Sequence, residues 1–95
     1  MLIIAGKLYV DAADRDQVVA DNLEMVARAR RQPGCLDLVI AADPTEADRI
    51  NNFELWESER HLADWRAIAN APKLDFDRER SDVQKHQISG SGPPF

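Results

Sequence analysis

The sequence predicts an α+β fold in which helices cover one face of an antiparallel sheet. Segments rich in apolar and β-branched residues alternate with segments in which apolar residues recur at helical spacing. They follow one another in the order strand, helix, strand, strand, helix, strand, and the two consecutive strands are close enough in sequence to pair as a hairpin. A chain of 95 residues suffices for one such domain, and an interface between subunits would help so small a core.

The first third of the chain contains a predicted strand and a predicted amphipathic helix. Residues 2–10 are apolar and rich in β-formers, with Gly6 as the expected position of a bulge or a close approach. Asp14, with Gln17 three residues later, forms a capping-box pattern that opens the helix, and Pro33-Gly34 closes it. The predicted core-facing stripe of this helix consists of Val19, Leu23, Val26 and Ala27.

A hairpin is predicted in the middle of the chain. Residues 35–42 and 49–56 have the pattern of strands and are joined by residues 43–48, a polar connection that contains a proline. So short a connection indicates antiparallel pairing. In the first of these strands, alternation is expected to place Leu36, Leu38 and Ile40 on one face.

A second helix follows the hairpin. Ser58 can cap this helix, in which Leu62, Trp65 and Ala69 recur at helical spacing and are expected in the core. After the interruption at Pro72, residues 72–80 are predicted to hold another helical turn or two, with their apolar side chains Leu74 and Phe76 facing inward.

The chain ends with a predicted polar strand and a tail. Residues 82–88 are weakly hydrophobic and alternate imperfectly, which is typical of an edge strand or a hydrated wall. The tail is too rich in Gly and Pro for a regular element, although its Phe95 can dock on a surface. We therefore assign residues 1–89 to one domain and residues 90–95 to the tail.

Composition and charge exclude several function classes. Lys and Arg number 12 against 17 Asp and Glu, a net charge of −5, without a basic run or stripe, so nucleic acid is not an expected partner. No apolar run approaches the roughly 20 residues of a membrane span, and no secretion signal precedes the first strand. The single Cys35 permits no intrachain disulfide and is expected to be a small buried hydrophobe. The cytoplasm is the expected location.

The predicted order is that of a ferredoxin-like β-α-β-β-α-β domain. Its helices lie on one face of the sheet only, so something else must cover the other face. A second subunit packed sheet to sheet is the simplest cover, and it would enclose a cavity. The sequence therefore predicts a homodimer.

Residues 52–56 hold the candidate functional side chains. Because side chains alternate along a strand, Asn52, Glu54 and Trp56 share one face and Phe53 and Leu55 the other. An amide, a carboxylate and an indole in a row suit the wall of a pocket better than a dry interior. We expect Phe53 and Leu55 to hold the strand against the helices, and the polar row to line the cavity of the dimer.

Four segments of the chain resemble the antibiotic biosynthesis monooxygenase family, whose members are small dimeric α/β-barrel proteins. The segments are residues 3–10, residues 29–36 with their Pro-Gly-Cys turn, residues 42–44, and residues 53–58 with their Glu-Leu-Trp-Glu-Ser sequence. Together they extend over nearly the whole chain. The resemblance implies a homodimer and, for some members, oxidation of a phenol, quinol or anthrone-like substrate by O2 without metal or flavin.

The resemblance also implies site residues. In the cofactor-free oxygenases, an Asn and a Trp four residues later on one strand line the cavity, and Asn52 and Trp56 match this pair as catalytic residues. Asn52 can donate its amide N–H to an enolate oxygen, and Trp56 can stack on a flat ring and offer its indole N–H. Glu54 can act as a base or only pair with a basic group nearby.

Two histidines are supporting candidates. His61 follows the third strand near the start of the second helix, and His86 lies on the last strand. Either can carry a proton, although each alone is more often a surface or hydrogen-bonded histidine. Many family members carry a histidine where this chain has Trp65, and its absence weighs against a mechanism that needs that imidazole and against a haem ligand.

Two alternatives to a monooxygenase remain open. One is a non-catalytic dimeric protein that carries a small hydrophobic ligand, and the other is a haem-degrading relative. A cavity lined by Asn52, Trp56 and a titratable group would favour an enzyme, whereas an Asn52 that is hydrogen-bonded away from an apolar cavity would favour carriage.

Overall fold

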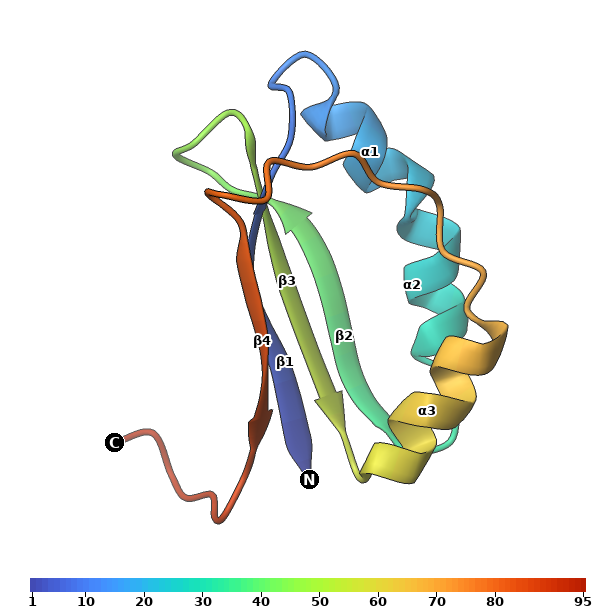
Figure 1. Cartoon of the computed structure of the whole chain (residues 1–95). Coiled ribbons are helices and arrows are strands. Elements are labelled where there is room, and N and C mark those ends of the chain that lie inside the picture. The colour runs from blue at the N-terminus through green and yellow to red at the C-terminus, as the bar shows by residue number, and fades with distance from the viewer.

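The computed structural model describes residues 1–95 and contains one sheet with helices on one side (Figure 1). Its elements are β1 (Leu2–Tyr9), α1 (Arg15–Asp21), α2 (Leu23–Ala29), β2 (Cys35–Ala42), β3 (Arg49–Trp56), α3 (Glu59–Ile68) and β4 (Asp82–Gln87). The four strands are antiparallel in the order β2-β3-β1-β4. The predicted α+β, ferredoxin-like order is confirmed, and the sheet of the single chain is open at β2 and β4.

The helix-covered face of the sheet carries the hydrophobic core. Leu2 pairs with Trp56 and Ile4 pairs with Glu54, and paired residues of neighbouring strands share a face. The buried cluster joins these strand residues to α2 and α3, and its members are Leu2, Ile4, Val26, Ala29, Leu38, Trp56, Leu62, Trp65 and Ala69. The face that carries Trp56 is therefore the face on which the helices pack.

The opposite side of the sheet, which we call the uncovered face, has no helix over it (Figure 1). Its central residues alternate with those of the core and are all partly exposed: Ile3, Ala5, Val39, Ala41, Phe53 and Leu55. Phe53 and Leu55 do not hold β3 against the helices as expected, because residues 52, 54 and 56 occupy the helix-covered face. The expected faces of β3 are thus reversed.

The hairpin matches the predicted strand ranges, but β2 contains an irregularity. Its register with β3 shifts between Cys35 and Asp37, so that Leu36 lies between paired residues. Leu36 is 48% exposed, whereas Leu38 is buried. The expected common face of Leu36, Leu38 and Ile40 therefore holds only for the last two.

The connection between β2 and β3 is held by side chains. Asp43 Oδ1 accepts from Asn51 Nδ2 at 2.8 Å, and its Oδ2 accepts from the backbone N–H groups of Thr45 and Glu46. Arg15 at the start of α1 donates from one guanidinium nitrogen to the backbone carbonyls of residues 43, 46 and 49. These bonds replace the ladder that the turn interrupts.

The predicted first helix is two short helices. Asn22 separates α1 from α2, and its side chain donates to the Val18 carbonyl at 2.8 Å. Asp14 occupies the N-cap position but accepts no cap hydrogen bond, and the Gln17 side chain donates to Asp21, so the predicted capping box is not formed. The break rotates the buried stripe onto Val26 and Ala29, and the expected stripe residue Leu23 is 58% exposed.

The second predicted helix is confirmed as α3. Ser58 accepts from the backbone N–H of His61 at 3.2 Å, and Leu62, Trp65 and Ala69 are buried. The helix stops before Asn70, whose φ of 49° breaks the helical geometry. None of the three helices combines the length and the apolarity of a membrane span.

The helix predicted for residues 72–80 is wrong. The segment runs past α1 and α2 as irregular chain and ends in a turn at residues 78–80 (Figure 1). Leu74 and Phe76 are half-buried, as the expected inward orientation implies. The backbone from 70 to 76 makes no hydrogen bond to other backbone groups, and most of these residues are exposed, so that water can satisfy their donors and acceptors.

The last strand and the tail differ in order. β4 pairs with β1 at the edge of the sheet, as expected, and the ladder ends where Ile88 N–H donates to the Met1 carbonyl at 3.1 Å. Phe95 does not dock on its own subunit: it is fully exposed at 112%.

Candidate functional site

The polar row of β3 forms a hydrogen-bonded group. Trp56 Nε1 donates to Glu54 Oε1 at 3.0 Å, and Asn52 Nδ2 donates to Glu54 Oε2 at 3.3 Å. One carboxylate therefore accepts from both of the donors that the sequence assigns to a substrate oxygen. Alternation along the strand brings the three side chains to one face, so the predicted grouping is present.

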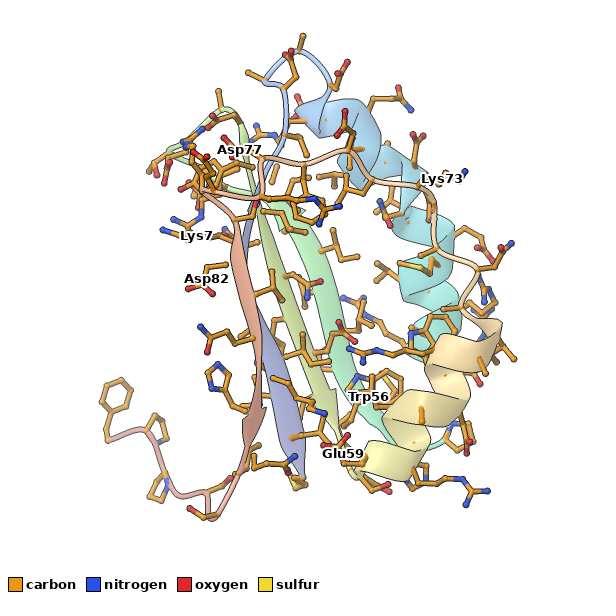
Figure 2. The ribbon with its side chains drawn as sticks, in the orientation of Figure 1. Lys7, Trp56, Glu59, Lys73, Asp77 and Asp82 are labelled. Atoms are coloured by element: carbon orange, nitrogen blue, oxygen red, sulfur yellow. The ribbon has the colours of Figure 1, made fainter.

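Trp56 is the buried end of this row. It is 0% exposed, and its ring stacks on Trp65 of α3 with the centroids 6.5 Å apart and the planes at 24°. Figure 2 shows Trp56 pointing from the end of β3 towards α3. The indole of Trp56 thus contacts the indole of Trp65, and its contact with a flat substrate stays a prediction.

Asn52 and Glu54 are the accessible part of the row. Both are partly exposed, whereas Trp56 reaches the site through Glu54. Beside Asn52 the neighbouring strands place Gly6 on β1 and Ile40 on β2. Gly6 has no side chain, and the β4 backbone at Asp82 and Val83 fills the space that its Cβ would take.

The location of the row corrects the predicted cavity. Residues 52, 54 and 56 lie between the sheet and the helices of one subunit and not on the uncovered face, where a partner sheet would enclose them. The physical reason is the size of Trp56, since the largest buried side chain fills the layer between β3 and α3. A site built from this row lies between the sheet and the helices of the same chain.

His61 is held apart from the row. Its Nδ1 lies 2.8 Å from Ser58 Oγ, and no hydrogen bond joins its ring to Glu54 or Asn52. The ring packs on Gly34, where an added Cβ would overlap His61 Cγ. His61 therefore joins the Pro33-Gly34 turn to the start of α3.

His86 and Cys35 also lie outside the polar group. His86 pairs with Ile3 and so faces the uncovered side of the sheet, opposite to Asn52. Cys35 packs against the core cluster, and burial, followed by the nearby charges of Glu54 and Asp37, raises the pKa of its thiol. A thiol held protonated is a poor nucleophile, in agreement with the expected role as a small hydrophobe.

The cavities of the molecule lie at the other end of the helix layer. One of about 440 Å³ separates α1 from the irregular segment that carries Lys73 (Figure 2), and it is lined by Val10, Asp11, Asp14, Gln17, Val18, Asp21, Lys73, Leu74 and Asp75. A second, of about 430 Å³, shares Val10, Asp11 and Asp75 with it. Neither is lined by Asn52, Glu54 or Trp56. Local sequence pattern predicts neither cavity, because both form where residues 73–80 pack against the end of β1 and, in the first cavity, against α1.

The arrangement of the row allows limited chemistry without further groups. The Glu54 carboxylate can accept a proton, and the Asn52 amide can donate a hydrogen bond once Glu54 releases it. The row thus holds one carboxylate with a neutral amide donor and an indole donor bonded to it.

Solved structures share the whole fold. The chain superposes on a provisionally named antibiotic biosynthesis monooxygenase from Deinococcus radiodurans with a TM-score of 0.68 at 15% identity, covering 100% of this chain and 99% of that chain. For a protein of the same name from Chloroflexus aurantiacus, the TM-score is 0.61 at 25% identity, with 96% of each chain covered.

A haem-degrading protein shares the fold as well. MhuD from Mycobacterium tuberculosis, solved with two haems in its active site, gives a TM-score of 0.66 at 11% identity over 98% of this chain and 100% of that chain. At such identity the likeness extends to the fold alone.

Sequence comparison identifies the family. No curated protein matches the chain. The profile described as Antibiotic biosynthesis monooxygenase matches residues 1–70, a range that contains β1 to α3 and the entire polar row. The chain belongs to the antibiotic biosynthesis monooxygenase family.

Proposed function

We propose that the protein is a cofactor-independent monooxygenase that uses O2 to oxidise a small phenol, quinol or anthrone-like molecule. The family supports oxygenase chemistry in general. The cofactor-independent mechanism is supported by one observation: Glu54 accepts hydrogen bonds from both Asn52 and Trp56. This arrangement supports a pairing of a base, Glu54, with an oxygen-binding donor, Asn52, on one rigid strand.

Proton transfer to Glu54 would start the reaction. An anthrone-like substrate loses a C–H proton to the carboxylate and becomes an enolate that is rich enough in electrons to reduce O2. A neutral carboxyl is a weaker acceptor than a carboxylate, so protonation of Glu54 loosens its bond from Asn52. The freed amide N–H can then donate to the enolate oxygen. Proton uptake by Glu54 is thereby coupled to the release of the Asn52 amide as a donor.

The overall reaction balances without another reductant. The substrate CH2 group and O2 become a carbonyl group and water, and Glu54 returns its proton to the oxygen that leaves as water. Trp56 does not contact the substrate in this scheme. It fixes the orientation of the carboxylate through the 3.0 Å hydrogen bond, while its ring keeps water out of the layer beneath.

A homodimer supports the same function. The uncovered face presents a row of aliphatic and aromatic side chains, which a single chain leaves in water. Packing two such faces together buries them and completes the two-sheet layer that the family resemblance implies. In this arrangement each subunit keeps its own site, on the far side of its sheet.

Oxygen consumption tests the proposal. The purified protein is incubated with anthrones, hydroquinones and naphthols, and O2 uptake is followed. The products formed from 18O2 are analysed by mass spectrometry. We expect uptake above buffer with at least one substrate and one labelled oxygen in the product. A broad panel that gives no uptake would refute the monooxygenase.

A carrier of small hydrophobic ligands is the second candidate. The observation that favours it is the satisfied state of Asn52, whose amide is bonded to Glu54 and not directed into a cavity. A carrier predicts saturable binding of a naphthol by equilibrium dialysis with no oxygen consumed. Binding accompanied by turnover would exclude it.

A further inference from the structure

We propose that residues 89–95, here called the C-terminal arm, bind to the second copy of this chain in the homodimer. The inference rests on the homodimer proposed above and adds to it a contact that the sheet faces alone do not supply.

The arm makes no stabilising contact with its own subunit. All seven of its residues are exposed, and the last hydrogen bond before it is made by Ile88. A Cβ atom added to Gly90 or Gly92 would meet nothing within 4 Å. The arm ends in Phe95, the only fully exposed large apolar side chain of the protein. An aromatic ring left in water forgoes about 2 kcal/mol of burial.

The arm leaves the molecule on the side where a second copy would lie. Figure 1 shows it turning away from the end of β4 to the side opposite to the helices. Figure 2 places Lys7 and Asp82, two residues that pair on the uncovered face, on that same side. A second copy that packs on the uncovered face would therefore also lie within reach of the arm.

The length of the arm fits a partner better than its own sheet. Seven extended residues reach roughly 23 Å, whereas packed sheets lie only about 10 Å apart. The arm can thus pass the plane of the partner sheet and reach its edge. The two glycines allow it to turn, and Pro93-Pro94 then holds the chain extended, which lowers the entropy lost when Phe95 docks.

We choose the second copy as the binding partner of the arm, because the same association that brings it near the arm also covers the uncovered face. Folding back onto its own subunit would place the arm on the surface that the dimer needs, so the two contacts would compete. In a two-fold dimer both arms can dock at once, and each buries the Phe95 ring that a single chain leaves in water.

Photo-crosslinking from the end of the arm tests the proposal. The full-length protein carries p-benzoylphenylalanine at position 95, and a control protein carries it at the exposed position 31, after α2. Both are illuminated in the dimeric state, which light scattering confirms beforehand. We expect a covalent dimer from position 95 and none from position 31. Cross-links confined to monomer mass, or none, would overturn the arm contact.

Removal of the arm gives an independent measure. A chain that ends at Ser89 should keep its circular dichroism and thermal midpoint, since the arm packs on nothing in its own subunit. Its dimer dissociation constant should rise about 1,000-fold, because each of the two arms loses the burial of one aromatic ring. An unchanged dissociation constant would contradict the inference while leaving the homodimer intact, and a monomeric full-length chain would refute both.

Discussion

The rings of Trp56 and Trp65 stack 6.5 Å apart, and this pair occupies the layer between β3 and α3 where the family resemblance places a histidine. Trp65 also lies under the guanidinium of Arg28, which is 5.1 Å from its ring. At the position of Trp65 this chain therefore has an indole ring, which cannot exchange a proton as an imidazole does. In the proposed mechanism, acid–base chemistry at the polar row is therefore assigned to Glu54.

Replacement of Trp65 should cost stability before it affects chemistry. Trp65→Ala removes a buried ring and leaves Trp56 without its stacking partner, so we expect the free energy of unfolding to fall by about 3–5 kcal/mol. Trp65→Phe keeps most of the volume and should cost less than half of that. Urea denaturation measures both. Equal losses for the two variants would show that the stack is not the source of the stabilisation.

Replacement of Glu54 should separate catalysis from structure. In Glu54→Gln the side-chain oxygen can still accept from Trp56, and a flipped Asn52 amide can accept from the new NH2 group. We therefore expect little change in the thermal midpoint, together with a drop in kcat of about 100-fold or more. Glu57→Gln is the matched control, since Glu57 is exposed on the same strand end and should be neutral. Full activity of Glu54→Gln would rule out the proposed base.

The two constrained glycines should respond differently to alanine. Gly34 has φ of 79°, and a Cβ there would overlap the His61 ring. Gly34→Ala should therefore cost about 1–3 kcal/mol, and His61→Ala should recover part of that loss by removing the ring. At Gly6 the added Cβ would meet the Asp82 carbonyl of the β4 backbone, which no side-chain deletion can clear. A double-mutant cycle measures the coupling at Gly34, and additivity would mean that φ alone is responsible.

Stability should fall in acid through Asp43. The Asn51 amide, then the Glu46 and Thr45 donors, hold the pKa of Asp43 well below its usual range. Because the folded pKa is lowered, the stabilisation is complete above the unfolded value of about 3.9 and is lost as the pH falls towards the folded pKa. The urea midpoint of the wild type should therefore drop more between pH 5 and pH 3 than that of Asp43→Asn. Parallel pH curves would contradict this assignment.

A charge on the uncovered face should dissociate the proposed homodimer. Phe53→Asp places a carboxylate in the apolar row, and burying it against a partner sheet would be costly, so we expect a folded monomer by sedimentation equilibrium. Leu23→Asp is the matched control, because Leu23 is exposed on the helix side and should leave the dimer unchanged. A dimeric Phe53→Asp would place the interface elsewhere.

The sequence by itself determined the order of elements, the hairpin and the grouping of residues 52, 54 and 56, because periods of 2 and 3.6 and capping residues are local signals. It did not determine which side of β3 the helices would cover. Both faces of the strand carry large apolar side chains, so alternation separates Phe53 from Trp56 without saying which is buried.

Tertiary structure decided that question and the roles that depend on it. Contact with Trp65 buries Trp56, and the hydrogen bond from Trp56 holds the Glu54 carboxylate. The irregular course of residues 70–76 and the cavities beside it also arise from packing between distant segments. Side-chain volume and long-range packing, rather than local pattern, set the position of the candidate site between the sheet and the helices.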